Sequence, residues 1–195
     1  NTLDNYRDPS SGIDLVLSAE LAGLGGDNHF VKLQHDTTWY HAFGEKKRWV
    51  LMWRSRQGWM TEFGSSDYVP LQDRFYAGGT TTVRGYDNRD IGPKIREYLF
   101  WGDSFAVGGN LRVVSNLEMK YKVTDMFRLY TFIDSGGVWE DSGDLDLGDI
   151  KYSAGLGFGV DVPRMGPIRV DYGIPINPDD DQGSGRLHLT TGFQF

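Results

Sequence analysis

The chain of 195 residues contains no cysteine, which excludes a disulfide framework and a metal site built on thiolates. Its longest apolar run extends only from Trp49 to Trp53, far short of the roughly 18 to 20 residues that a membrane-spanning helix needs. A protein that crosses a membrane with helices is therefore excluded. No segment at the N-terminus combines the charged, apolar and small-residue regions of a signal peptide, so we expect a mature protein or a fragment.

Positive charge is scarce as well. Lysine and arginine together number 20 against 27 aspartates and glutamates, a formal net charge of −7. This argues against a nucleic-acid partner, because phosphate binding needs a basic surface. Hydrophobic residues make up 39% of the chain, aromatic residues reach 14%, and glycine contributes 26 residues. A polar but aromatic-rich composition is typical of a β-barrel whose strands alternate between lipid and water, and the length suits a single domain over residues 1–195.

Apolar and polar residues alternate with a period of two along much of the chain. In the first such segment Ile13, Leu15 and Leu17 share one face, and Asp14 and Ser18 lie on the other. This pattern predicts β-strands with one apolar and one wet face. We expect about eight of them, over residues 13–21, 31–43, 48–56, 111–121, 127–134, 151–161, 168–172 and 186–195.

Short turns and long loops alternate between these strands, as in outer-membrane barrels. The longest gap runs from about Trp59 to Gly108, and a stretch of that length in a compact protein indicates a functional loop. A soluble β-sandwich is the alternative, since its strands alternate too. Two observations favour the barrel: aromatic residues and leucines crowd the ends of the apolar faces like a girdle, and charged residues occupy the middle of the opposite faces. We therefore predict an all-β fold, a transmembrane antiparallel β-barrel.

The long loop contains the motif Val83-Arg84-Gly85-Tyr86. It resembles the Val-Arg-Gly-Phe/Tyr motif of the BamA/TamA family of outer-membrane barrel assembly factors. The resemblance covers essentially the whole chain and implies an integral protein of the bacterial outer membrane that is not an enzyme. The other matching stretches follow the family's order: residues 116–118, 132–139 and 155–172, and Phe193 and Phe195 of a C-terminal β-signal.

In that family the loop folds back into the lumen, and acidic residues of the inner barrel wall hold its arginine. Period-two counting places Glu118 and Asp134 on the polar faces of neighbouring strands, where two carboxylates can bind a guanidinium. An inserted arginine must be paired, because an unpaired buried charge is too costly. We therefore predict a clasp of Arg84 with Glu118 and Asp134, the alternative being an ordinary solvated loop arginine. Three glycines are expected to let the loop turn sharply and approach the wall: Gly78, Gly79 and Gly85.

The chain is shorter than members of the family. Their barrels have about sixteen strands, which is within the range of outer-membrane barrels, and periplasmic POTRA domains precede the barrel. Residues 1–12 are turn-like and resemble the family's stretch leading into the ninth strand. We expect either the C-terminal half of a larger barrel or a shortened member. Eight strands can close around a lumen filled by side chains, and pairing of two copies in a homodimer would also cover the open edges.

Other candidate sites are weaker. Gly155, Gly157 and Gly159 do not form a dinucleotide motif, because a strand and a turn follow where a helix is required; we interpret them as a smooth inner wall with room for the loop. The histidines lack the spacing of a metal site, and the acidic clusters at residues 140–149 and 179–181 depart from a calcium-binding loop. No nucleophile elbow is present. We expect no catalytic residue, no metal and no cofactor.

The resemblance implies that the parent protein folds and inserts outer-membrane β-barrels through a lateral seam, where its first and last strands offer an edge to an incoming strand. It implies contacts with outer-membrane lipid and unfolded barrel substrates and, in a full-length protein, with POTRA domains and accessory lipoproteins. Two alternatives stay open. A protein-secretion pore or passive channel would conduct without residues 76–86, and the membrane anchor of a passenger enzyme would have a hydrolase domain upstream.

Overall fold

The computed structural model describes residues 1–23, 28–44, 46–96, 104–162, 166–179 and 183–192. In these ranges the only helices are two short 3-10 turns, η1 (Ser142–Asp144) and η2 (Leu147–Asp149), and no helix there is long and apolar enough to cross a membrane. Eight strands form one antiparallel sheet, which confirms the predicted all-β fold. In sheet order they are β1 (Gly12–Ala22), β2 (Phe30–Phe43), β3 (Trp49–Glu62), β6 (Leu111–Lys122), β7 (Phe127–Trp139), β8 (Lys151–Val162), β9 (Gly166–Pro175) and β10 (Arg186–Thr191).

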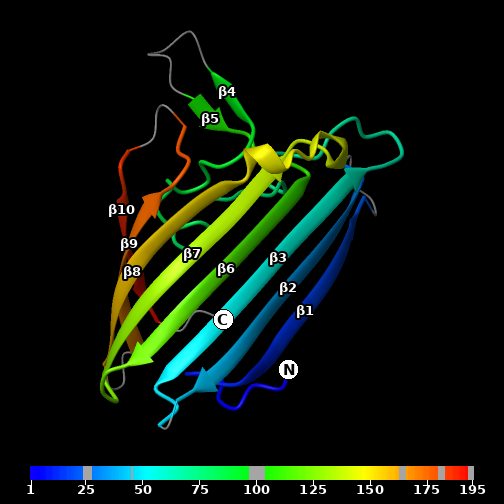
Figure 1. Ribbon diagram of the computed structural model, residues 1–195. Coiled ribbons are helices and arrows are strands. Elements are labelled where there is room, and N and C mark those ends of the chain that lie inside the picture. Colours follow the sequence, from blue (N-terminus) through cyan, green and yellow to red (C-terminus); the bar gives the residue numbers. More distant parts are fainter. Residues whose placement is uncertain (24–27, 45, 97–103, 163–165, 180–182, 193–195) are drawn as a thin grey trace.

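The sheet is curved but open (Figure 1). Its two edges are β1 and β10, and within the described residues these strands do not pair with each other. The chain therefore forms half a barrel, and closure of eight strands on themselves is not the arrangement observed. The inserted loop gives the physical reason, because a closed eight-stranded barrel has a lumen only wide enough for its own side chains.

The connections segregate by length, as predicted. Residues 44–48 and 123–126 form short turns at one end of the sheet, and residues 63–110, 140–150 and 176–185 form longer connections at the other (Figure 1). Within the longest connection, β4 (Lys94–Arg96) and β5 (Ser104–Ala106) pair as a small antiparallel hairpin. The long connections therefore gather at one end of the half-barrel.

Three strands are longer than predicted: β3 ends at Glu62 rather than at 56, β7 ends at Trp139 rather than at 134, and β9 spans Gly166–Pro175 rather than 168–172. β3 continues through Glu62, so the long loop begins at residue 63 rather than near Trp59. Gly58 interrupts the alternation of side chains in this part of the strand. It is a glycine because the ring of Phe75 occupies the space where a Cβ would lie. At the other end of the chain β10 is described only as far as Thr191. The expected β-signal of Phe193 and Phe195 lies outside the described residues.

The two faces of the sheet have opposite polarity. The convex, outer face leaves large apolar side chains exposed, where a soluble sandwich would bury them in a core. The concave, inner face buries polar and charged groups. This inverted pattern matches a wall between lipid and a wet lumen. Exposed on the outer face are Leu15, Leu17, Leu33, Trp53, Leu117, Leu129, Ile133, Leu156, Phe158, Val170, Tyr172, Leu187 and Leu189, and buried on the inner face are Glu118, Lys120, Arg128, Asp134, Asp171 and His188.

Aromatic rings line the outer face beside the short turns. Neighbouring rings contact one another along β2 and then across β3 to β6, with centroids 4.5 to 6.5 Å apart. Amphipathic rings are favoured at the boundary between lipid and water, so this ladder corresponds to the expected aromatic girdle. Its members are Trp39, His41, Phe43, Trp49 and Tyr121.

The N-terminal segment before β1 lies against the inner face at the short-turn end. Asp8 forms ion pairs with Lys120 (2.5 Å), Lys122 (2.7 Å) and Arg128 (3.1 Å). Burial alone would raise the pKa of Asp8, but these three cations outweigh it and hold that pKa well below its usual range. The segment that looked merely turn-like in the sequence is therefore attached to β6 and β7, mainly through the Asp8 carboxylate and also through the Pro9 carbonyl oxygen, which accepts from Lys120 Nζ (3.2 Å).

Candidate functional site

The motif of the long loop reaches the inner wall through tight backbone turns. Gly78, Gly79 and Gly85 have φ angles of 102°, 92° and 94°, a region that side chains with a Cβ rarely occupy. At Gly85 a Cβ would also lie 3.0 Å from the carbonyl carbon of Gly173 on β9. These glycines therefore let the loop turn back and touch the sheet.

Arg84 projects from this turn onto two carboxylates of the inner wall. Its Nε donates to Asp134 Oδ2 (2.7 Å), its Nη2 to Asp134 Oδ1 (2.9 Å) and its Nη1 to Glu118 Oε2 (2.8 Å). The backbone N–H of Arg84 adds a bond to Asp134 Oδ2 (3.1 Å). The structure thus brings together the three residues placed in the clasp by the sequence. The Arg84–Asp134 pair has the bidentate geometry that gives guanidinium–carboxylate contacts their strength.

Two further residues of the cluster, both on β9, were not anticipated. Arg169 donates to both oxygens of Glu118 (3.0 and 2.6 Å) and through Nε to Asp171 Oδ1 (2.9 Å). Asp171 Oδ2 lies 3.6 Å from Arg84 Nη1. The period-two pattern had placed Arg169 and Asp171 on a polar face, but β9 is not a neighbour of β6. Only the curvature of the sheet brings the two strands face to face.

The complete cluster contains two arginines and three carboxylates in a nearly dry setting. Arg84 keeps only 6% of its side chain exposed, and Asp134 none. Burial by itself would lower the pKa of Arg84, but the hydrogen bonds and charge of Asp134, with the charges of Glu118 and Asp171, raise it above its usual value. The guanidinium therefore stays charged, and its positive charge is compensated inside the wall.

An aromatic ring stacks against one face of each guanidinium group. The Arg84 guanidinium carbon lies 3.5 Å from the ring centroid of Phe132, and that of Arg169 lies 3.7 Å from the centroid of Tyr130. Such stacking adds a cation–π attraction and excludes water from one side of each planar group. Both arginines are thereby held in the orientation that their carboxylate partners require.

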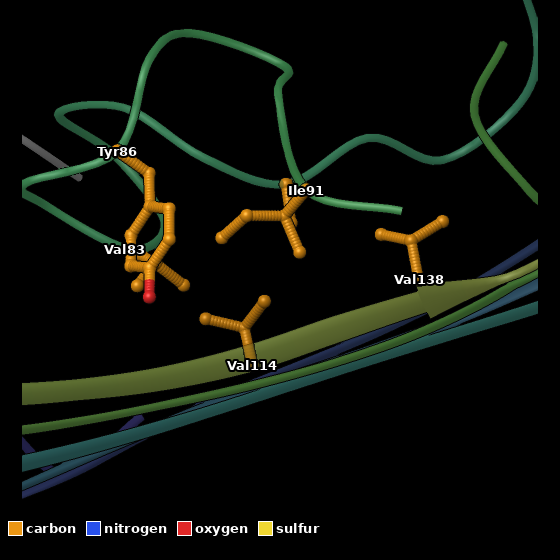
Figure 2. Close-up of a cluster of buried hydrophobic side chains, with 6 residues drawn as sticks. Val83, Tyr86, Ile91, Val114 and Val138 are labelled. Atoms are coloured by element: carbon orange, nitrogen blue, oxygen red, sulfur yellow. The ribbon is translucent and has the colours of Figure 1, made fainter. Parts of the chain in front are cut away.

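The apolar residues of the motif pack on the other side of the turn. Val83, Tyr86 and Ile91 point from the loop toward Val114 of β6 and Val138 of β7 (Figure 2). The Tyr86 hydroxyl lies 3.1 Å from the carbonyl oxygen of Tyr152 and 3.2 Å from Asn177 Oδ1. Burial raises the pKa of Tyr86 to about 12. The loop is thus attached to the wall by a hydrophobic cluster as well as by charge.

The glycines of β8 make room for the clasp itself. A Cβ at Gly157 would overlap Asp171 Oδ1, and one at Gly155 would overlap the ring of Phe132. The smooth wall inferred from the sequence is present, but wall side chains fill the space above it. On β9, Gly173 is the glycine that faces the loop, since a Cβ there would lie 2.6 Å from the backbone nitrogen of Gly85.

The described residues contain no group of three or more histidine, cysteine, aspartate or glutamate side chains arranged to hold a metal ion. The cluster around Arg84 consists of charges already satisfied by one another. Chemically, it can fix the loop to the wall through a closed network of hydrogen bonds.

Comparison with known proteins identifies the family of this chain. The sequence profile described as the Omp85 superfamily domain matches residues 1–195. The chain belongs to the Omp85 superfamily. It is 34% identical over 202 residues to outer membrane protein assembly factor BamA of Nitratidesulfovibrio vulgaris, covering 100% of this chain and 24% of that protein. BamA of Neisseria meningitidis is 26% identical over 224 residues, covering 99% of the chain and 28% of the relative.

Similarity extends to eukaryotes and to a solved structure. Sorting and assembly machinery component 50 homolog A of Xenopus laevis is 26% identical over 210 residues, covering 96% of the chain and 42% of the relative. The crystal structure of BamA from Haemophilus ducreyi lacking POTRA domains 1–3 matches with a TM-score of 0.83 at 24% identity, covering 98% of this chain and 40% of that one. This Omp85 chain thus spans about a quarter of its bacterial relatives, and it forms part of an integral outer-membrane barrel.

Proposed function

We propose that the protein containing this Omp85 chain folds and inserts other β-barrel proteins into the bacterial outer membrane. The observation that carries the proposal is the position of β10 at one edge of the sheet, where it pairs with β9 alone within the described residues. An edge strand presents unpaired N–H and C=O groups, which an unfolded strand can bind by β-augmentation. The names of the bacterial relatives as outer membrane protein assembly factors support the same reading.

In this proposal β10 is one side of a lateral seam at which substrate strands enter. Within the described residues β10 (Arg186–Thr191) pairs with β9 alone. Its separation from β9 would cost the backbone hydrogen bonds of a single ladder. Unfolded barrel proteins would be the substrates and outer-membrane lipid the medium, with POTRA domains and accessory lipoproteins as partners of the full-length protein.

The clasp around Arg84 has a supporting role in this mechanism. It holds the loop against β6, β7 and β9, and so keeps the wall beside the seam in one shape while β10 moves. No covalent chemistry is needed, because strand exchange replaces one set of backbone hydrogen bonds with another.

Site-specific photo-crosslinking tests the proposal. The full-length protein in liposomes would carry a photo-crosslinking side chain at Leu189 of β10 or, as a control, at Leu156 of β8. These positions are 67% and 66% exposed on the outer face. With an unfolded barrel substrate trapped during insertion, we expect crosslinks from Leu189 and not from Leu156. Equal labelling from both positions, or no insertion of the substrate at all, would contradict the proposal.

A further inference from the structure

The last strand is held from the lumen as well as by its neighbour. His188, in the middle of β10, pairs in the ladder with Asp171 of β9 and is 8% exposed. Its Nε2 accepts the backbone N–H of Gly85 at 2.8 Å, and its Nδ1 lies 3.1 Å from Thr80 Oγ1. The partners on the loop are 103 and 108 residues away in the sequence. One side chain of the edge strand thus contacts the turn that carries Arg84.

The hydrogen-bond roles fix the protonation of this imidazole. A backbone N–H can only donate, so Nε2 must be the nitrogen without a proton. A neutral imidazole then carries its proton on Nδ1 and donates it to the hydroxyl of Thr80. An imidazolium has no acceptor nitrogen. Protonation of His188 would therefore break the bond to Gly85.

The charged side chains around the His188 imidazole already have ion-pair partners of their own. Carboxylates face the imidazole from β9 (Asp171) and β7 (Asp134), and both bind the arginines of the clasp. Cations face it from the loop (Arg84) and from β10 (Arg186). Within the described residues both carboxylates are thus paired with arginines, and the contact of His188 Nε2 with the Gly85 N–H needs the neutral ring.

A second contact between β10 and the loop is of a different kind. Arg186 forms an ion pair with Asp87, but the two side chains are 39% and 49% exposed. Exposed pairs of this type contribute little and are screened by salt. Of the two contacts, only the one through His188 is buried and geometrically specific.

We propose that His188 is a latch, a positioning residue through which the loop turn at Gly85 holds β10 in place against β9. In its neutral form the imidazole joins the strand to the loop, and loss of its acceptor nitrogen releases the strand from the lumen side. The consequence for opening of the seam rests on the proposed function. The latch itself is a property of the barrel without substrate.

Hydrogen exchange on the full-length protein in lipid nanodiscs tests the latch. His188→Leu removes the acceptor, and His188→Gln keeps an oxygen acceptor that does not titrate. At about pH 8, above the ordinary histidine range, we expect the amides of Gly85 and of residues 186–191 to exchange about fivefold faster or more in His188→Leu. His188→Gln should stay close to the wild type. Leu189→Ala, on the outer face of the same strand, is the matched control and should not change Gly85.

Lowering the pH separates the latch from a general packing role. Between about pH 8 and about pH 5, exchange at Gly85, corrected for its intrinsic pH dependence, should accelerate in the wild type and not in His188→Gln. Thr80→Val, which removes only the acceptor of Nδ1, provides a gentler variant and should show a smaller acceleration than His188→Leu. Unchanged Gly85 exchange in His188→Leu, or the same pH response in His188→Gln as in the wild type, overturns the latch. Since no substrate is present, either result leaves the crosslinking test of the assembly function untouched.

Discussion

The inner wall of this half-barrel accommodates buried arginine in two ways. On the side of β6 to β9, Arg84 and Arg169 share three carboxylates, and each guanidinium lies over an aromatic ring. Every ion pair of these two arginines joins two members of the cluster. The loop and the wall on this side are therefore joined in one closed network of ion pairs.

From β2 and β3 to the start of β6, arginine side chains outnumber the carboxylates that pair with them among the described residues. Arg54 pairs with Asp36, and Arg56 reaches the carbonyl oxygen of Thr81 and Asn116 Oδ1. Arg112 lies over the ring of Phe75 at 5.0 Å. Among the residues that the structure describes, neither Arg56 nor Arg112 has a carboxylate partner in an ion pair.

The difference shows where the loop is anchored. A buried charge network with excellent geometry is costly to break at one member, because the partners are left buried and uncompensated. An arginine that binds carbonyl oxygens or a ring leaves no buried opposite charge when it is removed. The same residue type should therefore have very different mutational effects on the two sides of one lumen.

The largest effect is expected for Arg84→Met, which removes the ion-pair partner of Asp134 and leaves Glu118 and Asp171 paired with Arg169 alone among the described residues. We expect a loss of about 3–5 kcal/mol in the free energy of unfolding, since the remaining carboxylates stay buried. Urea unfolding of the detergent-purified protein, followed by heat-modifiable mobility on gels, would measure it. A loss no greater than that of a surface substitution would show that the clasp does not stabilise the wall.

Gly157→Ala tests the same cluster by adding atoms to it instead of removing them. The new Cβ would overlap Asp171 Oδ1, and overpacking of this kind costs about 1–3 kcal/mol. Gly143→Ala is the matched control, since no atom lies within 4 Å of a Cβ at that exposed position. Equal midpoints of urea unfolding for the two variants would contradict the packing described for β8.

Asp8→Asn tests an intermediate case, one carboxylate, 27% exposed, facing three cations. We expect a loss of about 1 kcal/mol at neutral pH, discounted for partial exposure. Because the folded pKa lies below the unfolded value, the stabilisation is complete above about pH 4 and declines as the pH falls through the lowered folded pKa. Unfolding curves of wild type and variant should therefore converge in acid. A difference that grows on acidification would have the wrong sign.

The smallest effect is expected for Arg56→Met. It removes bonds to a carbonyl and an amide oxygen but leaves no carboxylate without a partner, so the cost should be about 1 kcal/mol or less. The same urea series would measure it beside Arg84→Met. A cost comparable to that of Arg84→Met would erase the distinction between the two sides of the wall.

Much of this architecture could be predicted from the sequence because the alternation of polarity is local. Strand positions, the inverted faces and the motif around Arg84 all follow from residues close in the chain. The prediction fell short where glycine interrupted the pattern, as at Gly58, whose missing side chain is replaced by the ring of Phe75. Such a replacement comes from 17 positions away and leaves no trace in the local pattern.

Contacts across the lumen were the other gap. Arg169 and Asp171 were correctly placed on a polar face, but their meeting with Glu118 and Arg84 depends on the curvature of the whole sheet. The contact of His188 with Gly85 likewise depends on the path of the loop through the lumen. Sequence periodicity assigns a face to a residue, and only the tertiary structure says what that face meets.

The most direct test of the account is the rate at which the full-length protein in liposomes folds an unfolded β-barrel substrate. The comparison would use Arg84→Met and Arg56→Met at equal amounts of folded protein. We predict a loss of at least about tenfold for Arg84→Met, as expected when a buried charge pair is broken, and a rate within about twofold of wild type for Arg56→Met. Equal rates for the two variants would contradict the claim that the clasp on the β6–β9 side holds the loop for assembly.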